Sequence, residues 1–163
     1  MGKALDTRFI SGLEDNTRNA MVELLNERLA DMIDLALAIK QAHWNLKGSG
    51  FIGVHELLDA VVERVRESSD TIAERAQVIG GHARGTTQDV AGNSKMDAYP
   101  TDLVHVDDHV NALVERFSAV GKRLRSAIDQ AGEAGDEDTA DLFTEVSRQV
   151  DKDSWMIGSN VAP

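Results

Sequence analysis

Proline is almost absent from this chain, and that absence constrains the fold more than any other feature. Only Pro100 and Pro163 occur among 163 residues. Because proline is the strongest helix breaker, long stretches are free to stay helical. Apolar residues recur at intervals of three and four, as at Leu25, Leu29 and Met32. This spacing indicates helices and not the alternation of strands.

The pattern predicts four long helices, at about residues 16–45, 51–79, 101–128 and 136–157. Residues 82–100 are predicted to form a long polar crossover that can contain one or two short turns of helix. Residues 1–15 show no clear period and are predicted to form a mobile or loosely docked tail. Four helices with one long crossover favour an all-α, ferritin-like four-helix bundle that occupies residues 16–163.

Composition excludes several functional classes. The chain has no cysteine, which rules out a disulfide scaffold, a thiol nucleophile and a Cys-ligated metal centre. No run of 18 apolar residues exists to span a membrane, and the N-terminus lacks the apolar core of a signal peptide, so we expect a cytoplasmic protein. The net charge of −11 argues against a nucleic-acid-binding surface and is compatible with cationic partners such as metal ions.

Four residues with metal-binding side chains share one stripe of the second predicted helix. His55 and Asp59 are four residues apart, and so are Asp70 and Glu74. At 100° per residue, all four fall within about 100° of arc, next to the apolar face of the helix. Carboxylates at such a border are partly desolvated, so they need a cation or strong hydrogen bonds.

One chain cannot bring both pairs to a single ion, because Asp59 and Asp70 are about 16 Å apart along the helix axis. Antiparallel two-fold pairing of this helix with its copy would do so, and would create two equivalent sites per dimer. His43 lies across the turn from the start of the second helix, close to His55 in a helical hairpin. The combined set of two imidazoles and three carboxylates suits Fe(II), Mn(II) or Zn(II).

Spacing alone leaves plainer interpretations open. A histidine on a helix is usually hydrogen-bonded or exposed, and a carboxylate pair four residues apart usually belongs to a solvated face. Trp44 fits a core or interface anchor as well as a redox role. Three further histidines have no partner pattern, and we interpret them as surface or loop residues: His82, His105 and His109.

Several segments resemble the Dps family, the DNA-protection-during-starvation proteins or mini-ferritins. The most specific is the His-Trp-Asn element at 43–45, followed by His55 and Asp59 at fixed distances. The resemblance covers about residues 17–160. The similar segments are 40–48, 51–59, 70–76, 80–81, 85–87, 98–100, 138–142, and 151–152 with Trp155.

The resemblance implies a four-helix subunit that assembles into a hollow homododecamer, with a ferroxidase centre at the two-fold interface. Fe(II) would be oxidised there, by hydrogen peroxide in preference to oxygen, and stored in the cavity as ferric oxide. Two neighbouring irons can pass two electrons to peroxide without releasing hydroxyl radical. The implied iron ligands are His43, His55 and Asp59 of one subunit with Asp70 and Glu74 of its partner.

Two further roles follow from the resemblance. Trp44, beside the centre, would donate an electron and trap a stray oxidising equivalent. Asp136, Asp138 and Asp141, at the start of the fourth helix, are candidates for lining acidic pores, although carboxylates in a first turn also suit the helix dipole.

Two departures separate this chain from related designs. Conventional ferritins place Glu-x-x-His motifs inside one bundle, and no such motif occurs here. DNA-condensing Dps proteins often carry a Lys-rich tail, whereas the first 18 residues here have no net side-chain charge and residues 156–163 contain no base. Because little counterion release is then available, we expect DNA protection to be chemical. Asp153 and Gly158 also depart from the expected pattern and put the packing of the last helix in question.

Two alternative functions remain at this stage. One is a nucleoid-associated protein whose main task is to compact DNA, with iron binding secondary. The other is a helical shell without catalytic activity. Saturable Fe(II) binding and DNA mobility shifts discriminate among the three.

Overall fold

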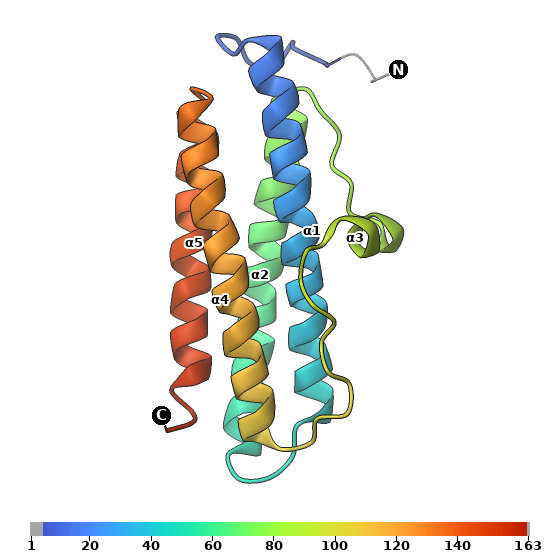
Figure 1. The fold of residues 1–163 in the computed structure, drawn as a ribbon, viewed down its shortest axis with the longest axis vertical. Coiled ribbons are helices and arrows are strands. Elements are labelled where there is room, and N and C mark those ends of the chain that lie inside the picture. Colours follow the sequence, from blue (N-terminus) through green and yellow to red (C-terminus); the bar gives the residue numbers. More distant parts are fainter. Residues whose placement is uncertain (1–4, 163) are drawn as a thin grey trace.

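The computed structural model describes residues 5–162, and these residues form a bundle of four long helices with one short helix beside it (Figure 1). No strand occurs in this range, where the only β-type pairing is an isolated bridge between Lys47 and His105. The prediction of an all-α bundle is confirmed. The helices are α1 (Asp15–Asn45), α2 (Phe51–Val78), α3 (Thr87–Asn93), α4 (Val106–Glu133) and α5 (Glu137–Gly158).

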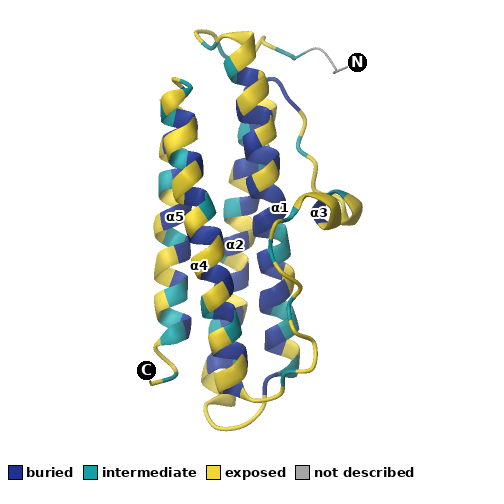
Figure 2. Ribbon diagram, in the orientation of Figure 1, coloured by how far each residue is buried: buried dark blue, intermediate teal, exposed yellow. Residues whose placement is uncertain are grey.

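Two helical hairpins build the bundle. A short turn joins α1 to α2, another joins α4 to α5, and the crossover between α2 and α4 travels the length of the bundle on the outside (Figure 1). The buried faces of all four long helices point toward a common core (Figure 2). Phe117 of α4 and Phe143 of α5 lie in it with Leu25 and Leu35 of α1. Each such side chain contributes about 1.5–3 kcal/mol through burial.

The crossover contains a short helix, as the prediction allowed, but the helix that follows it begins later than predicted. Residues 87–93 form α3, capped by the Thr86 side chain, which accepts a hydrogen bond from the backbone of Asp89. The helix α4 begins at Val106 and not at 101–102. The reason is that residues 104–106 pair with the chain just after α1, since Lys47 donates its N–H to Val104 and accepts from Val106.

The first described residues dock on the bundle. The N–H of Asp6 donates to the carbonyl of Gly80 at 3.0 Å. The buried guanidinium of Arg18 donates to the carbonyls of Ile10, Leu13 and Ile79. Gly80 has a φ of 98°, and a Cβ there would lie 2.5 Å from the carbonyl oxygen of Asp6. Residues 1–4 of the predicted tail lie outside the described residues.

The two departures in the last helix have structural reasons. Asp153 is fully buried, and its carboxylate accepts hydrogen bonds from Arg64 of α2 and from Gln149. Gly158 packs closely on α4, where a Cβ would come within 3.1 Å of Val114. Both residues therefore fit the packing of α5. No helix among residues 5–162 is long and apolar enough to cross a membrane.

Candidate metal centre

The last turn of α1 and the first turns of α2 bring His43 and His55 into direct contact. Their rings stack with centroids 3.7 Å apart. Each Nδ1 lies 2.9 Å from the backbone carbonyl oxygen of the other histidine. The hairpin thus fixes both rings by reciprocal hydrogen bonds, and His43 is 7% exposed.

These bonds determine which nitrogen of each ring can bind a metal. A carbonyl oxygen only accepts hydrogen bonds, so each Nδ1 must carry the proton. When a ring is neutral, its Nε2 then keeps the lone pair. Orienting an imidazole through its second nitrogen is the usual arrangement in metal sites. In both rings, Nε2 is therefore the nitrogen that could bind a metal.

Asp59 lies one turn further along α2 and adds a carboxylate to the pair. Its Oδ1 is 3.5 Å from Nδ1 of His43. The same oxygen accepts a hydrogen bond from Nζ of Lys40 at 2.8 Å. That hydrogen bond is the main reason why the pKa of Asp59 lies below its ordinary value, with smaller contributions from the two histidines. The carboxylate is ionised at neutral pH and contacts a cation of the chain itself.

The other two predicted ligands do not join this group within one chain. Asp70 and Glu74 are exposed on α2, beginning 11 residues beyond Asp59, or about 16 Å along the axis. Among the described residues, no three His, Asp or Glu side chains are arranged to hold a metal ion. A complete centre would need ligands from outside the subunit, as the two-fold pairing of α2 predicts.

The two helices that carry the histidines also expose aromatic and apolar side chains. Trp44 is 67% exposed, with Nζ of Lys40 5.8 Å from its ring centroid. The ring of Phe51 lies 5.0 Å from that of His55. Ile52 and Leu37 are also exposed on the same two helices. Trp44 is thus outside the core of the subunit, where it is available to an interface or to a one-electron oxidant.

Asp136 does not have the environment predicted for a pore residue. It is 2% exposed, and its carboxylate accepts hydrogen bonds from Arg75 at 2.7 Å and from the hydroxyl of Thr139. It also caps α5 through the backbone of Thr139. Its charge is used within the subunit, so the pore assignment of Asp136 is wrong. Asp138 and Asp141 are exposed, and for them the assignment stays a prediction.

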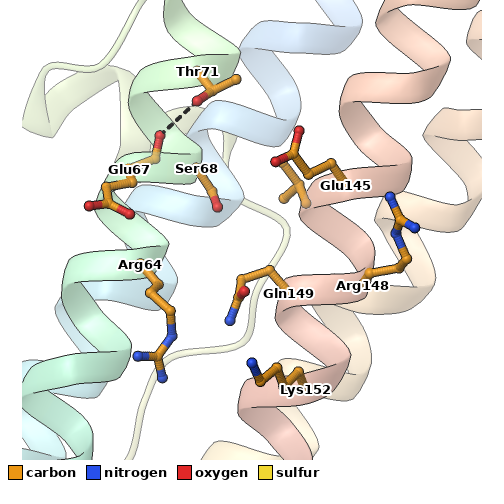
Figure 3. Close-up of a pocket in the computed structure, with 9 residues that line it drawn as sticks. Arg64, Glu67, Ser68, Thr71, Glu145, Arg148, Gln149 and Lys152 are labelled. Carbon is orange, nitrogen blue, oxygen red and sulfur yellow. Dashed lines mark hydrogen bonds between the residues drawn. The ribbon is translucent and has the colours of Figure 1, made fainter.

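A cleft of about 460 Å³ between α2 and α5 is a separate feature (Figure 3). Its walls carry both signs of charge, and none of the predicted ligands lines it. Arg64 at its edge is held by the buried Asp153. The labelled lining residues are Arg64, Glu67, Ser68, Thr71, Glu145, Arg148, Gln149 and Lys152.

His109 has a role that its sequence position did not reveal. It is 1% exposed, so its interpretation as a surface or loop residue is wrong. Its Nδ1 lies 2.8 Å from the hydroxyl of Tyr99, and its Nε2 lies 3.1 Å from the carbonyl oxygen of Leu103. The apolar spacing around it, with Val106, Val110 and Leu113 all buried, was the available signal.

Comparisons with known proteins agree with the fold. The sequence matches the Ferritin-like domain family over residues 22–162, which establishes a ferritin-like protein. It is 49% identical over 149 residues to the "DNA protection during starvation protein" of Agrobacterium fabrum, covering 91% of this chain and 92% of that one. It is 31% identical to the protein of the same name from Mycolicibacterium smegmatis, covering 93% of this chain and 82% of the relative.

Solved structures give the same result. The structure of Mycobacterium smegmatis Dps in its tetragonal form superposes with a TM-score of 0.90 at 30% identity, covering 95% of this chain and 94% of that one. DpsC from Streptomyces coelicolor superposes with a TM-score of 0.91 at 29% identity, covering 100% and 95%. The chain belongs to the Dps family of ferritin-like proteins, as the resemblance predicted.

Proposed function

We propose that this chain is the subunit of a cytoplasmic iron-storing shell that oxidises Fe(II) and thereby protects DNA. The observation that carries the proposal is the pair of oriented imidazoles, His43 and His55, beside the ionised carboxylate of Asp59. This group is half of a nitrogen- and oxygen-ligated centre of the kind that suits Fe(II). Family membership, with relatives named for DNA protection during starvation, supports the same function.

The second half of the centre would come from Asp70 and Glu74 of a neighbouring subunit. In an antiparallel pair of α2 helices, these exposed carboxylates face the histidines of the partner. Two Fe(II) ions held there would each give one electron to hydrogen peroxide, or to oxygen more slowly, and become Fe(III). Peroxide that accepts both electrons with two protons leaves as water, without hydroxyl radical.

Charge favours the delivery and storage of iron. Twelve chains at −11 would carry −132 formal charges, so a dodecameric shell attracts cations to its surface and lumen. Asp138 and Asp141 would line the entry route. Ferric ions leaving the centres would collect as oxide inside. Trp44, exposed beside Lys40, would trap oxidising equivalents that escape.

The first test is an anaerobic Fe(II) titration followed by peroxide, on wild type and on Asp59→Ala. We expect wild type to bind Fe(II) saturably and oxidise it fast, and Asp59→Ala to lose fast oxidation while still assembling. Asp129→Ala, which removes an exposed carboxylate of α4, is the matched control and should behave as wild type. Equal rates in all three proteins would refute the centre.

The second test asks whether the centre is shared between subunits. Asp59→Ala and Asp70→Ala are each expected to be inactive alone. In a mixed dimer, one site receives both substitutions and the other receives none. Random co-assembly makes half of the dimers mixed, so about one quarter of the wild-type activity should return. A site confined to one chain gives no recovery.

The assembly and the alternative function have their own measurements. Sedimentation should show twelve chains of 17.7 kDa, about 212 kDa in total. We expect weak DNA binding at physiological salt, because the first 18 residues have no net side-chain charge and offer little counterion release. Tight DNA binding by the assembled protein would instead favour the DNA-compacting function.

A further inference from the structure

The chain has a single tyrosine, Tyr99, and its phenol is aimed at a buried imidazole. The hydroxyl of Tyr99 lies 2.8 Å from Nδ1 of His109, and Nε2 of His109 lies 3.1 Å from the carbonyl oxygen of Leu103. Because the carbonyl only accepts, Nε2 carries the proton and Nδ1 keeps its lone pair. The Tyr99 hydroxyl must therefore donate its proton to Nδ1.

The surroundings keep this pair neutral until the phenol is oxidised. Burial lowers the pKa of His109, with opposing effects from its bond to Leu103 and from Asp108. Burial raises the pKa of Tyr99 above its ordinary value, although the Arg116 guanidinium opposes this. That guanidinium lies 5.8 Å from the ring centroid. A positive charge on the ring would be repelled, so loss of an electron requires loss of the proton to His109.

The pair lies at the same end of the bundle as the metal ligands. The bridge between Lys47 and His105 joins the chain just after α1 to the residue just before α4. These two helix ends lie at the same end of the bundle (Figure 1). His43 is four residues before Lys47, and His109 is four residues after His105. Both imidazoles thus lie about one helical turn from the bridge. A cavity of about 220 Å³, lined in part by Tyr99 and Arg116, gives small oxidants access to the phenol.

We propose that Tyr99 and His109 form a redox-active pair that quenches one-electron oxidants arising when Fe(II) meets hydrogen peroxide. The proposal rests on the proposed iron and peroxide chemistry for its oxidant, the hydroxyl radical. This role is distinct from that of Trp44, which is exposed, whereas the Tyr99 hydroxyl is hydrogen-bonded to a buried imidazole.

The quenching cycle balances in two steps. In the first, Tyr99 gives one electron to the hydroxyl radical, which takes a proton from solvent and becomes water. The phenolic O–H bond breaks and its proton binds Nδ1 of His109, leaving a neutral tyrosyl radical beside an imidazolium. In the second, a further Fe(II) gives one electron to the radical and becomes Fe(III), while the proton returns from His109. The sum consumes one hydroxyl radical, one Fe(II) and one proton.

The test is electron paramagnetic resonance of samples frozen after Fe(II)-loaded protein meets peroxide. With one tyrosine in the chain, a tyrosyl signal has one assignment. We expect it in wild type, absent in Tyr99→Phe and mostly lost in His109→Gln. Glutamine can still accept from Tyr99 and donate to Leu103, but its amide does not take up a proton. His82→Gln, which changes an exposed histidine, should keep the full signal.

A second arm separates this proposal from the ferroxidase proposal. Iron-free protein is oxidised by flash-generated tris(bipyridine)ruthenium(III), which needs no metal centre. A tyrosyl signal that depends on His109 supports the pair. Slower oxidation of Tyr99 in D₂O than in H₂O also supports it, and this comparison uses wild-type protein alone. Equal signals in wild type and His109→Gln, or tryptophan radicals alone, overturn it. A signal in this arm but none with iron and peroxide overturns the quenching role.

Discussion

Lys40 occupies the position where a metal ion would compete for Asp59. Its ammonium donates to Oδ1 at 2.8 Å, with side-chain exposures of 20% for Lys40 and 57% for Asp59. Since an ion pair this exposed stabilises by about 0.2–1 kcal/mol, displacing it weakens Fe(II) binding by about 1.5- to 5-fold. Repulsion between the ammonium and the incoming ion acts in the same direction. Lys40→Met is therefore expected to tighten Fe(II) binding by about that factor.

Anaerobic calorimetric titration with Fe(II) measures this directly. Lys47→Met is the matched control, because it removes an exposed lysine from the adjacent turn and leaves the Asp59 contact intact. The hydrogen bond from Lys40 also lowers the pKa of Asp59, so its loss should move proton competition to higher pH. Weaker binding in Lys40→Met, or the same gain in Lys47→Met, would refute the displacement argument.

Three other predictions follow from the packing. Arg64→Met leaves the buried carboxylate of Asp153 without its cation, so the free energy of unfolding should fall by about 3 kcal/mol. Circular dichroism should then show a Tm lower by about 6–12 °C, and a decrease of less than about 2 °C would contradict this. The lowered pKa of His109 contributes stability in full above its ordinary pKa of 6.5, and this is lost as pH falls through the folded-state value. Denaturant unfolding of His109→Gln should lack this acid-side loss; an unchanged pH profile argues against it. Gly80→Ala places a side chain at a φ of 98° against the N-terminal segment, so the free energy of unfolding should fall by about 1–3 kcal/mol. Proteolysis of residues 5–13 should also become faster. Gly92→Ala is the control, because its Cβ meets no atom within 4 Å. Equal proteolysis of the two variants would refute this strain.

The four long helices were predictable because their apolar spacing repeats over many turns. Local spacing did not give the bounds of α3 or the start of α4. The seven residues of α3 bury only Val90, so they carry little periodic signal. The start of α4 depends on backbone pairing with Lys47, which is distant in the sequence.

Polar residues were harder to place than apolar ones. Three buried polar side chains have hydrogen-bond partners from other segments of the chain. Arg75 donates to Asp136, Arg64 donates to Asp153, and the hydroxyl of Tyr99 pairs with His109. No local pattern encodes such partners. The neighbourhood of His43 and His55 was predictable, because a short turn between two helices fixes it. Whether Asp70 and Glu74 complete the centre depends on a second subunit and stays a prediction.

The crossed bonds between the two stacked histidines have a consequence for anyone who redesigns this site. Each ring is anchored by the main-chain carbonyl of the other residue and stacks on the other ring, so rotating one ring breaks its own hydrogen bond and the stacking contact. Replacing one imidazole therefore removes the stacking partner of the other ring but leaves the carbonyl that orients it. Attempts to change the metal preference should vary both positions together and treat the hairpin as the smallest unit that can be exchanged.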